Sequence, residues 1–196
     1  MDTALLKRLK ACSRMTMQSK AQLLCRRPWS AVKPYALARV GRICCTEAQT
    51  FFGRRMLVVL PEMVSVSIWR YGVFEQDVAF YMMLTLNPGD TFIDIGGHFG
   101  FFSMLGRELV GPDGTVVIFE PMLDTRAILQ ENMERFAASA RHHLIAAAAG
   151  SAPGKLTFKD FGLAGSAFAT SGAERNANLV FRGEVEIDVC TVAIRL

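Results

Sequence analysis

Glycines preceded by an acidic residue are concentrated at positions 94–100, where the chain reads Asp-Ile-Gly-Gly-His-Phe-Gly. An apolar stretch at 91–95 precedes this segment, and a helical pattern at 101–109 follows it. Glycine permits a tight turn and close approach of a ligand to the backbone, and the first amides of a helix favour negatively charged groups. Glu120 ends the next apolar stretch, just before Pro121. An acid there can accept hydrogen bonds from both hydroxyls of a ribose, so the spacing predicts a nucleoside-binding site.

Two classes of cofactor fit this layout. A nicotinamide dinucleotide requires a G-x-G-x-x-G turn for its pyrophosphate, but Ile95 stands where the first glycine would be. Asp94 would also bring a carboxylate close to the phosphates. S-adenosylmethionine has no phosphate, and its ammonium group is complementary to an acid at a strand end. The sequence therefore favours S-adenosylmethionine, and a nicotinamide-dependent oxidoreductase is the less favoured alternative.

The elements around these residues alternate between apolar strands and helices. Strands without polar alternation, separated by helices, predict an α/β protein with a parallel sheet covered on both faces. The expected strands are 91–95, 115–119 and 143–149, with helices at 101–109 and 124–136. Upstream we expect strands at 56–60 and 64–69 and a helix at 73–86, and downstream shorter strands at 155–159 and 184–192. The 73–86 helix is expected to place Phe74, Val78, Tyr81 and Met82 on one face.

Charge is distributed unevenly along the chain. Through residue 55 there are twelve basic and two acidic residues, whereas the remainder has ten basic and sixteen acidic residues. We interpret residues 1–52 as a basic helical N-terminal extension with a solvated charged face. Peripheral contact with anionic lipid or a polyanion is one alternative, and an organelle-targeting presequence is another. Nucleic acid is not an expected partner, because no binding motif is present.

Several segments together resemble one family of enzymes. They are 88–96, 100–103, 119–121, Leu129 and Asn132, 147–150, the pair Gly72 and Glu75, and 185–193. In this combination the chain resembles the FkbM-type S-adenosylmethionine-dependent methyltransferases. The resemblance covers roughly residues 53–196, which we take as the methyltransferase domain.

The resemblance implies a Rossmann-like class I methyltransferase sheet and transfer of a methyl group, usually to oxygen. By position, Asp94, Gly96 and Gly100 would hold the amino-acid end of the cofactor, and Glu120 its ribose. Gly97 and His98 stand where the family commonly has Ala-Asn. They complete the predicted cofactor-binding set together with Glu75. We interpret His98 as a hydrogen-bonded spacer, and no residue can be named as the general base.

The acceptor implied by the resemblance is a small molecule or a sugar-containing compound. The family's later acidic K-I-D-x-E-G-like block is not found before Leu196, so we expect the domain and its sheet to be incomplete. A catalytically inactive, truncated cofactor-binding module is therefore a further hypothesis. The cysteines lack zinc or disulfide spacing, which indicates reduced thiols and a cytoplasmic protein. His142 and His143 have no partner at metal-ligand spacing, so no metal is expected.

Overall fold

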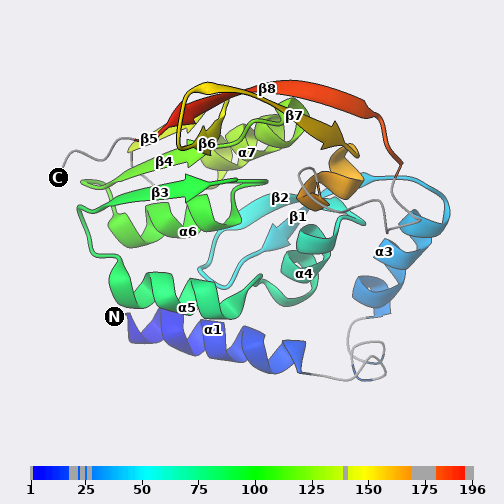
Figure 1. Cartoon of the computed structure of the whole chain (residues 1–196). Coiled ribbons are helices and arrows are strands. Elements are labelled where there is room, and N and C mark those ends of the chain that lie inside the picture. The colour runs from blue at the N-terminus through cyan, green and yellow to red at the C-terminus, as the bar shows by residue number, and fades with distance from the viewer. Residues whose placement is uncertain are drawn as a thin grey trace. The chain divides into compact units, whose positions relative to one another are not determined.

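The computed structural model describes residues 2–17, 22, 25, 28–138, 141–168 and 180–192. The chain divides into two compact units, Met1–Leu86 and Asn87–Leu196, which are described separately below. Figure 1 shows the elements of both units in chain order. The boundary between the compact units falls after Leu86. The division at residue 52 concerns the extent of the family domain and stays a prediction.

The described residues of the first unit form the helices α1, α3, α4 and α5 and a two-stranded hairpin. Its elements are α1 (Thr3–Thr16), α3 (Pro28–Arg39), β1 (Cys44–Gln49), β2 (Arg55–Leu60), α4 (Met63–Tyr71) and α5 (Gln76–Thr85). β1 and β2 are antiparallel, with Cys44 opposite Leu60 and Gln49 opposite Arg55. We predicted a helical extension over residues 1–52. The structure instead has a strand at residues 44–49, because these residues pair with the apolar strand β2. The β2 side chains that are fully buried are Met56, Val58, Val59 and Leu60.

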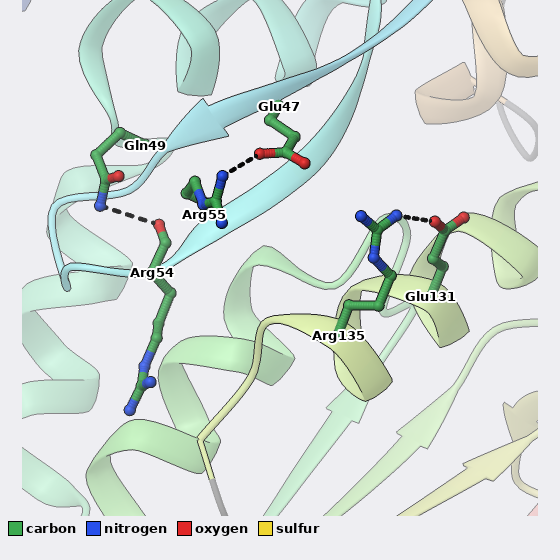
Figure 2. A network of polar contacts seen from close by, with 6 residues as sticks. All are labelled: Glu47, Gln49, Arg54, Arg55, Glu131 and Arg135. Carbon is green, nitrogen blue, oxygen red and sulfur yellow. Dashed lines mark hydrogen bonds and ion pairs between the residues drawn. The ribbon is translucent and has the colours of Figure 1, made fainter.

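Polar contacts hold the turn and the open side of this hairpin. Thr50 closes the turn, since its hydroxyl donates to the Arg54 carbonyl at 2.7 Å and accepts the Arg54 amide at 3.2 Å. Figure 2 shows Gln49 Nε2 donating to the same Arg54 carbonyl at 3.4 Å. It also shows Arg55 Nη1 paired with Glu47 Oε2 at 2.9 Å across the two strands. Side chains exposed to this degree contribute at most about 1 kcal/mol through such an ion pair.

Helix α4 occupies the segment that we expected to be a strand at 64–69. The prediction was wrong because Glu62, which is buried, begins a helix there. Its carboxylate accepts the amides of Val64 at 2.9 Å and Ser65 at 2.7 Å, which are two of the unpaired donors of a first helical turn. Gly72 ends the helix with a φ of 72°, a conformation that glycine adopts without steric cost.

Among the other helices of the first unit, α1 and α3 contact α4, and α5 contacts α1. α1 begins at Asp2, whose side chain accepts the amide of Ala4, and it buries Leu5 and Leu9. In α5 the buried residues are Ala79, Met82 and Met83, whereas Val78 and Tyr81 are exposed. The predicted apolar face of this helix was therefore wrong by roughly one position, since Met82 alone of the four is buried.

The second unit contains a parallel sheet with strand order β3-β4-β5. Its elements are β3 (Thr91–Ile95), α6 (Phe101–Val110), β4 (Thr115–Phe119), α7 (Leu123–Arg135) and β5 (Arg141–Ile145). Thr91 lies opposite Thr115, which lies opposite Arg141, so neighbouring strands follow each other along the chain. The expected α/β class with a parallel sheet and intervening helices is confirmed.

Close packing and buried polar contacts hold the two crossover helices. α6 approaches β3 so closely that a Cβ at Gly106 would stand 2.4 Å from the ring of Phe92. Buried Arg107 of α6 donates to the Met133 carbonyl near the end of α7 at 2.8 Å. Figure 2 shows Arg135 paired with Glu131 one turn earlier on the exposed side of α7. α7 starts after Met122, so Asp124 lies in its first turn. Our prediction that Asp124 caps this helix was therefore wrong.

A second sheet follows in the same unit, with strand order β6-β8-β7. It consists of β6 (Ala148–Gly150), β7 (Gly154–Asp160) and β8 (Gly183–Thr191), with a 3-10 helix, η1 (Leu163–Phe168), between the last two. β6 is parallel and β7 antiparallel to β8. The predicted third strand at 143–149 is thus divided, because its second half joins this sheet. In the described part of the chain, no helix has both the length and the apolar content that crossing a bilayer requires.

Candidate functional site

The glycine turn between β3 and α6 has an uncommon backbone conformation. Gly96 and Gly100 have φ angles of 82° and 94°, and His98, which is not a glycine, has a φ of 51°. The amides of Gly96 and Gly97 both donate to the carbonyl of Phe119 at the end of β4, at 2.9 and 3.0 Å. The turn is therefore attached to the carboxyl end of the neighbouring strand.

Gly97 is required by space and not by backbone angle. A Cβ at this position would lie 2.4 Å from Ile118 Cγ2 and 2.8 Å from Leu129 Cδ1. Both distances are far below van der Waals contact, and both neighbours are fully buried. The turn thus packs directly on β4 and α7, as a ligand-binding turn with close backbone approach requires.

Asp94 lies at the end of β3 and is buried. Ser103 Oγ, from the first turn of α6, donates to Asp94 Oδ2 at 2.5 Å. Burial raises the pKa of the Asp94 carboxyl, and the hydrogen bonds from Ser103 partly oppose this change. A cation placed beside Asp94 would restore the charged form, because an opposite charge nearby favours ionisation.

Glu120 lies directly after β4, and 6% of its surface is exposed. Its Oε2 accepts the amide of His98 at 2.9 Å, and its Oε1 accepts the amide of Met122 at 3.0 Å. Burial raises the pKa of the Glu120 carboxyl to about 6, although these two amides and the charge of Arg126 act to lower it. Each carboxylate oxygen can accept two hydrogen bonds, so both keep capacity for a ligand hydroxyl.

The His98 side chain points to η1 and contacts Ser166. Its Nε2 lies 2.7 Å from Ser166 Oγ, and its ring centroid is 4.0 Å from that of Phe99. Ser166 Oγ also lies 3.1 Å from the carbonyl of Leu163, to which it donates. The hydroxyl then accepts from His98, which places the ring proton on Nε2. Burial lowers the pKa of His98 to about 4, so the ring is neutral near pH 7.

A pocket of about 230 Å³ opens beside these residues. It is lined by Met122, Leu123, Asp124, Thr125, Asp160, Gly162, Ser166 and Val185. It is continuous with the turn network, because Met122 donates to Glu120 and Ser166 contacts His98. Small-molecule sites usually span about 300–1,000 Å³, so this pocket suits one part of a nucleoside-sized ligand.

The structure brings together six of the seven predicted cofactor-binding residues. These are Asp94, Gly96, Gly97, His98, Gly100 and Glu120, all at the carboxyl ends of β3 and β4. Glu75 belongs to the first compact unit, where it is exposed at the start of α5 with a φ of 42°. Its role as a cofactor contact stays a prediction.

The arrangement limits which ligand the turn can accept. The amides of Gly96, Gly97 and His98 already donate to protein oxygens, so they are not available to a pyrophosphate. Two buried carboxyl groups, Asp94 and Glu120, would moreover face any phosphate placed there. The same groups suit a ligand with an ammonium group and a pair of hydroxyls. Within the ranges that the structure describes, no cluster of three potential metal ligands occurs.

Two contributors to the site were not predicted from the sequence. Ser166 binds His98 across 68 positions of sequence, and no local pattern marks it. Arg126 donates to the carbonyls of Glu120 and Pro121 at 2.9 and 2.7 Å, which fixes the backbone after β4. A basic residue one turn into the following helix was the available signal for Arg126.

Comparison with known proteins leaves the family open. No family model matches the chain, and no curated protein matches it, so membership of the FkbM-type family stays a prediction. Among solved structures, the chain is similar to one described as a "putative rRNA-methylase" from Clostridium thermocellum, with 22% identity and a TM-score of 0.35. The match covers 37% of this chain and 39% of that one. At this level the similarity does not extend to a reaction or a substrate.

Proposed function

We propose that the second unit binds S-adenosylmethionine and that the chain acts as a methyltransferase, with an oxygen of a small molecule or glycan as acceptor. The observation that carries the proposal is the position of two buried acids at the ends of adjacent parallel strands. Asp94 and Glu120 flank a glycine turn whose own amides are already engaged. Ligands of open α/β sheets bind outside the carboxyl ends of the strands, where this turn lies.

Each residue would have a separate task in holding the cofactor. Glu120 would accept hydrogen bonds from the ribose hydroxyls with the acceptor capacity that its two amide donors leave. Asp94, held by Ser103, would lie opposite the ammonium group. Gly96 and Gly100 provide the backbone turn, and Gly97 keeps it packed on β4. The neutral ring of His98 would act as a spacer towards η1 and not as a base.

S-adenosylmethionine supplies an activated methyl group when it is bound. The contribution of the chain to transfer would be alignment and exclusion of water, which lower the barrier without covalent participation of the protein. Buried Glu120 and Asp94 provide fixed points for alignment. η1, attached to His98 through Ser166, would shield the turn from water.

The test is calorimetric titration with S-adenosylhomocysteine, the product form of the cofactor. Glu120→Gln should weaken binding about tenfold or more, since a hydrogen bond to a charged group contributes about 1.5–3 kcal/mol. Glu134→Gln is the matched control, because Glu134 is an exposed glutamate on α7. It should leave the affinity unchanged.

Three other results would replace or refute this proposed function. Binding of NADH in place of S-adenosylhomocysteine would replace the proposal by a nicotinamide-dependent oxidoreductase. Binding of S-adenosylhomocysteine without methyl transfer to any oxygen acceptor would favour an inactive cofactor-binding module. Failure of the folded chain to bind either ligand would refute the cofactor site itself.

A further inference from the structure

Helix α3 has one side packed within the first unit, and its opposite side is exposed. The covered side includes Ser30 and Pro34, which are buried. Arg70 of α4 donates to the carbonyls of Ser30 and Ala31 at 2.8 and 3.3 Å, which holds α3 on α4. Lys33 lies 5.5 Å from the ring centre of Trp69, also on α4. These contacts attach this side of α3 to α4.

The opposite side carries large apolar and aromatic side chains that remain exposed. Trp29 is 78% exposed and Tyr35 66% exposed, and Val32 lies between them. Positions 29, 32, 36 and 39 follow the three-and-four spacing of one helix face, with Tyr35 at its edge. Exposed Val40 and Ile43 follow directly after the helix. We call this surface the α3 stripe, and it consists of Trp29, Val32, Tyr35, Arg39, Val40 and Ile43.

The segment of the chain that carries the α3 stripe is strongly basic. Residues 3–46 contain ten basic residues and no acidic one. Arg39 lies within the stripe, and Arg42 follows it, both exposed. Large apolar side chains exposed along one helix face are typical of an interaction site, and the neighbouring basic residues favour a partner that is anionic as well as apolar.

We propose that the α3 stripe is a peripheral membrane contact that inserts into the interface of an anionic lipid bilayer. Trp and Tyr favour the boundary between headgroups and acyl chains, while Val32, Val40 and Ile43 would enter its apolar side. Exposed Arg39 and Arg42 would meet anionic headgroups, each contributing about 1 kcal/mol near such a surface. This contact is independent of the proposed cofactor site.

Two other partners explain fewer of the observations. A second copy of the chain, docked through the same stripe, would bring two strongly basic surfaces together. Phosphates of a nucleic acid would pair with the cations but would leave the aliphatic side chains Val32, Val40 and Ile43 without an apolar environment. A lipid surface satisfies both the charge and the apolar area.

The chain offers an internal reporter for this contact, because it contains only two tryptophans. Trp69→Phe keeps a ring beneath Lys33 and leaves Trp29 as the single indole. The full-length chain with this substitution would be mixed with vesicles of phosphatidylcholine, with or without phosphatidylserine. We expect the emission of Trp29 to shift to shorter wavelength, and the protein to sediment, only with the phosphatidylserine vesicles. Added salt should reduce the binding, since exposed charges are screened.

Matched variants test whether vesicle binding depends on the α3 stripe or on any exposed aromatic side chain. Arg39→Gln should reduce vesicle partitioning about fivefold, which corresponds to the roughly 1 kcal/mol expected for one charge. Tyr35→Ala should reduce it about tenfold through lost apolar contact. Tyr81→Ala is the control, because Tyr81 is also 66% exposed but lies one turn from Asp77 on α5. It should bind vesicles as the parent does.

The proposal is overturned if the folded chain ignores phosphatidylserine vesicles, or if Tyr35→Ala and Tyr81→Ala bind them equally well. Two further outcomes would reassign the stripe. Dimerisation in sedimentation analysis that Tyr35→Ala abolishes would assign it to a second copy. A shift of Trp29 emission by RNA, with none by vesicles, would assign it to a nucleic acid.

Discussion

Burial of Glu120 makes the stability of the protein depend on pH in a defined direction. The pKa of its carboxyl is about 6 in the folded chain, against an ordinary value of 4.5, because 6% of the residue is exposed to water. Below about pH 4.5 the group is protonated in both folded and unfolded states. As the pH rises from there, the unfolded state loses its proton first. The folded state then holds more protons, so the free energy of unfolding falls with rising pH.

The size of this effect follows from the two pKa values. One pKa unit corresponds to about 1.36 kcal/mol, so complete passage through the window from pH 4.5 to about 6 removes about 2 kcal/mol. A typical domain has only about 5–15 kcal/mol of stability, so the change is large enough to measure.

Glu120→Gln provides the reference, because its side chain does not titrate. Asp94 and Glu62 also have raised pKa values, but they are present in both proteins and largely cancel in the difference. Urea unfolding, followed by circular dichroism from about pH 4 to 7.5, gives the free energy of both proteins. The value for the parent minus that for the variant should fall by about 2 kcal/mol across this range. A difference that stays flat with pH would show that the amides of His98 and Met122 balance the effect of burial on the Glu120 pKa, and one that rises would show that they outweigh it. Either result would refute the expected pH dependence.

Three further predictions concern the same site. The affinity for S-adenosylhomocysteine should fall up to about tenfold per pH unit below about pH 6, because protonated Glu120 accepts fewer hydrogen bonds; calorimetry at several pH values measures this. Gly97→Ala should lower the free energy of unfolding by about 1–3 kcal/mol in thermal melts, since its Cβ would overlap buried side chains. Ser103→Ala should cost about 1–3 kcal/mol at pH 7, because buried Asp94 loses a donor. Urea unfolding at pH 4, where Asp94 is protonated more often, should show a smaller cost.

Each of these predictions has its own contrary result, and Gly97→Ala also has a matched control. Gly154→Ala has open space around the new Cβ and should melt as the parent does. Equal losses in Gly97→Ala and Gly154→Ala would mean that close packing of the turn is not the cause. An affinity for S-adenosylhomocysteine that does not change between pH 5 and 8 would exclude Glu120 as its acceptor. If Ser103→Ala lowers the free energy of unfolding by the same amount at pH 4 and at pH 7, its effect does not depend on the charge of Asp94.

The parallel sheet could be predicted closely from the sequence. Strands β3 and β4 begin and end where the apolar stretches at 91–95 and 115–119 do. A strand buried between layers carries a continuous apolar signal, and the glycine turn marks where the first one ends. The positions of Asp94 and Glu120 at the two strand ends followed from the same pattern.

Helix α4 was mispredicted because its composition conflicts with its environment. Its residues 64–68 alternate Val-Ser-Val-Ser-Ile, which is a strand-like pattern of β-branched and small residues. The helix forms because Glu62 caps it and because Val64, Ser65 and Ile68 share one buried face. Packing thus outweighs the local strand propensity. A buried glutamate is an uncommon helix cap, and the sequence pattern at 64–68 gives no sign of it.

The contact between His98 and Ser166 could not be predicted from the sequence. Residues predicted around the turn were all within one strand–helix–strand segment, where distances along the chain fix distances in space. η1 lies between β7 and β8 of the second sheet, and its position depends on how these two strands pair. Only long-range packing of that kind determines which side chain meets the histidine.

The strand order of the parallel sheet bears on how early the acid pair can assemble during synthesis. Thr91 pairs with a residue 24 positions later, and Thr115 with one 26 positions later, so each ladder closes over a short span of chain. Short spans have a low entropic cost of closure and favour rapid folding. Asp94, the glycine turn and Glu120 can therefore take their places once β5 has been made. His98 can contact Ser166 only after η1 has been made, so this part of the site assembles after the glycine turn and the two acids.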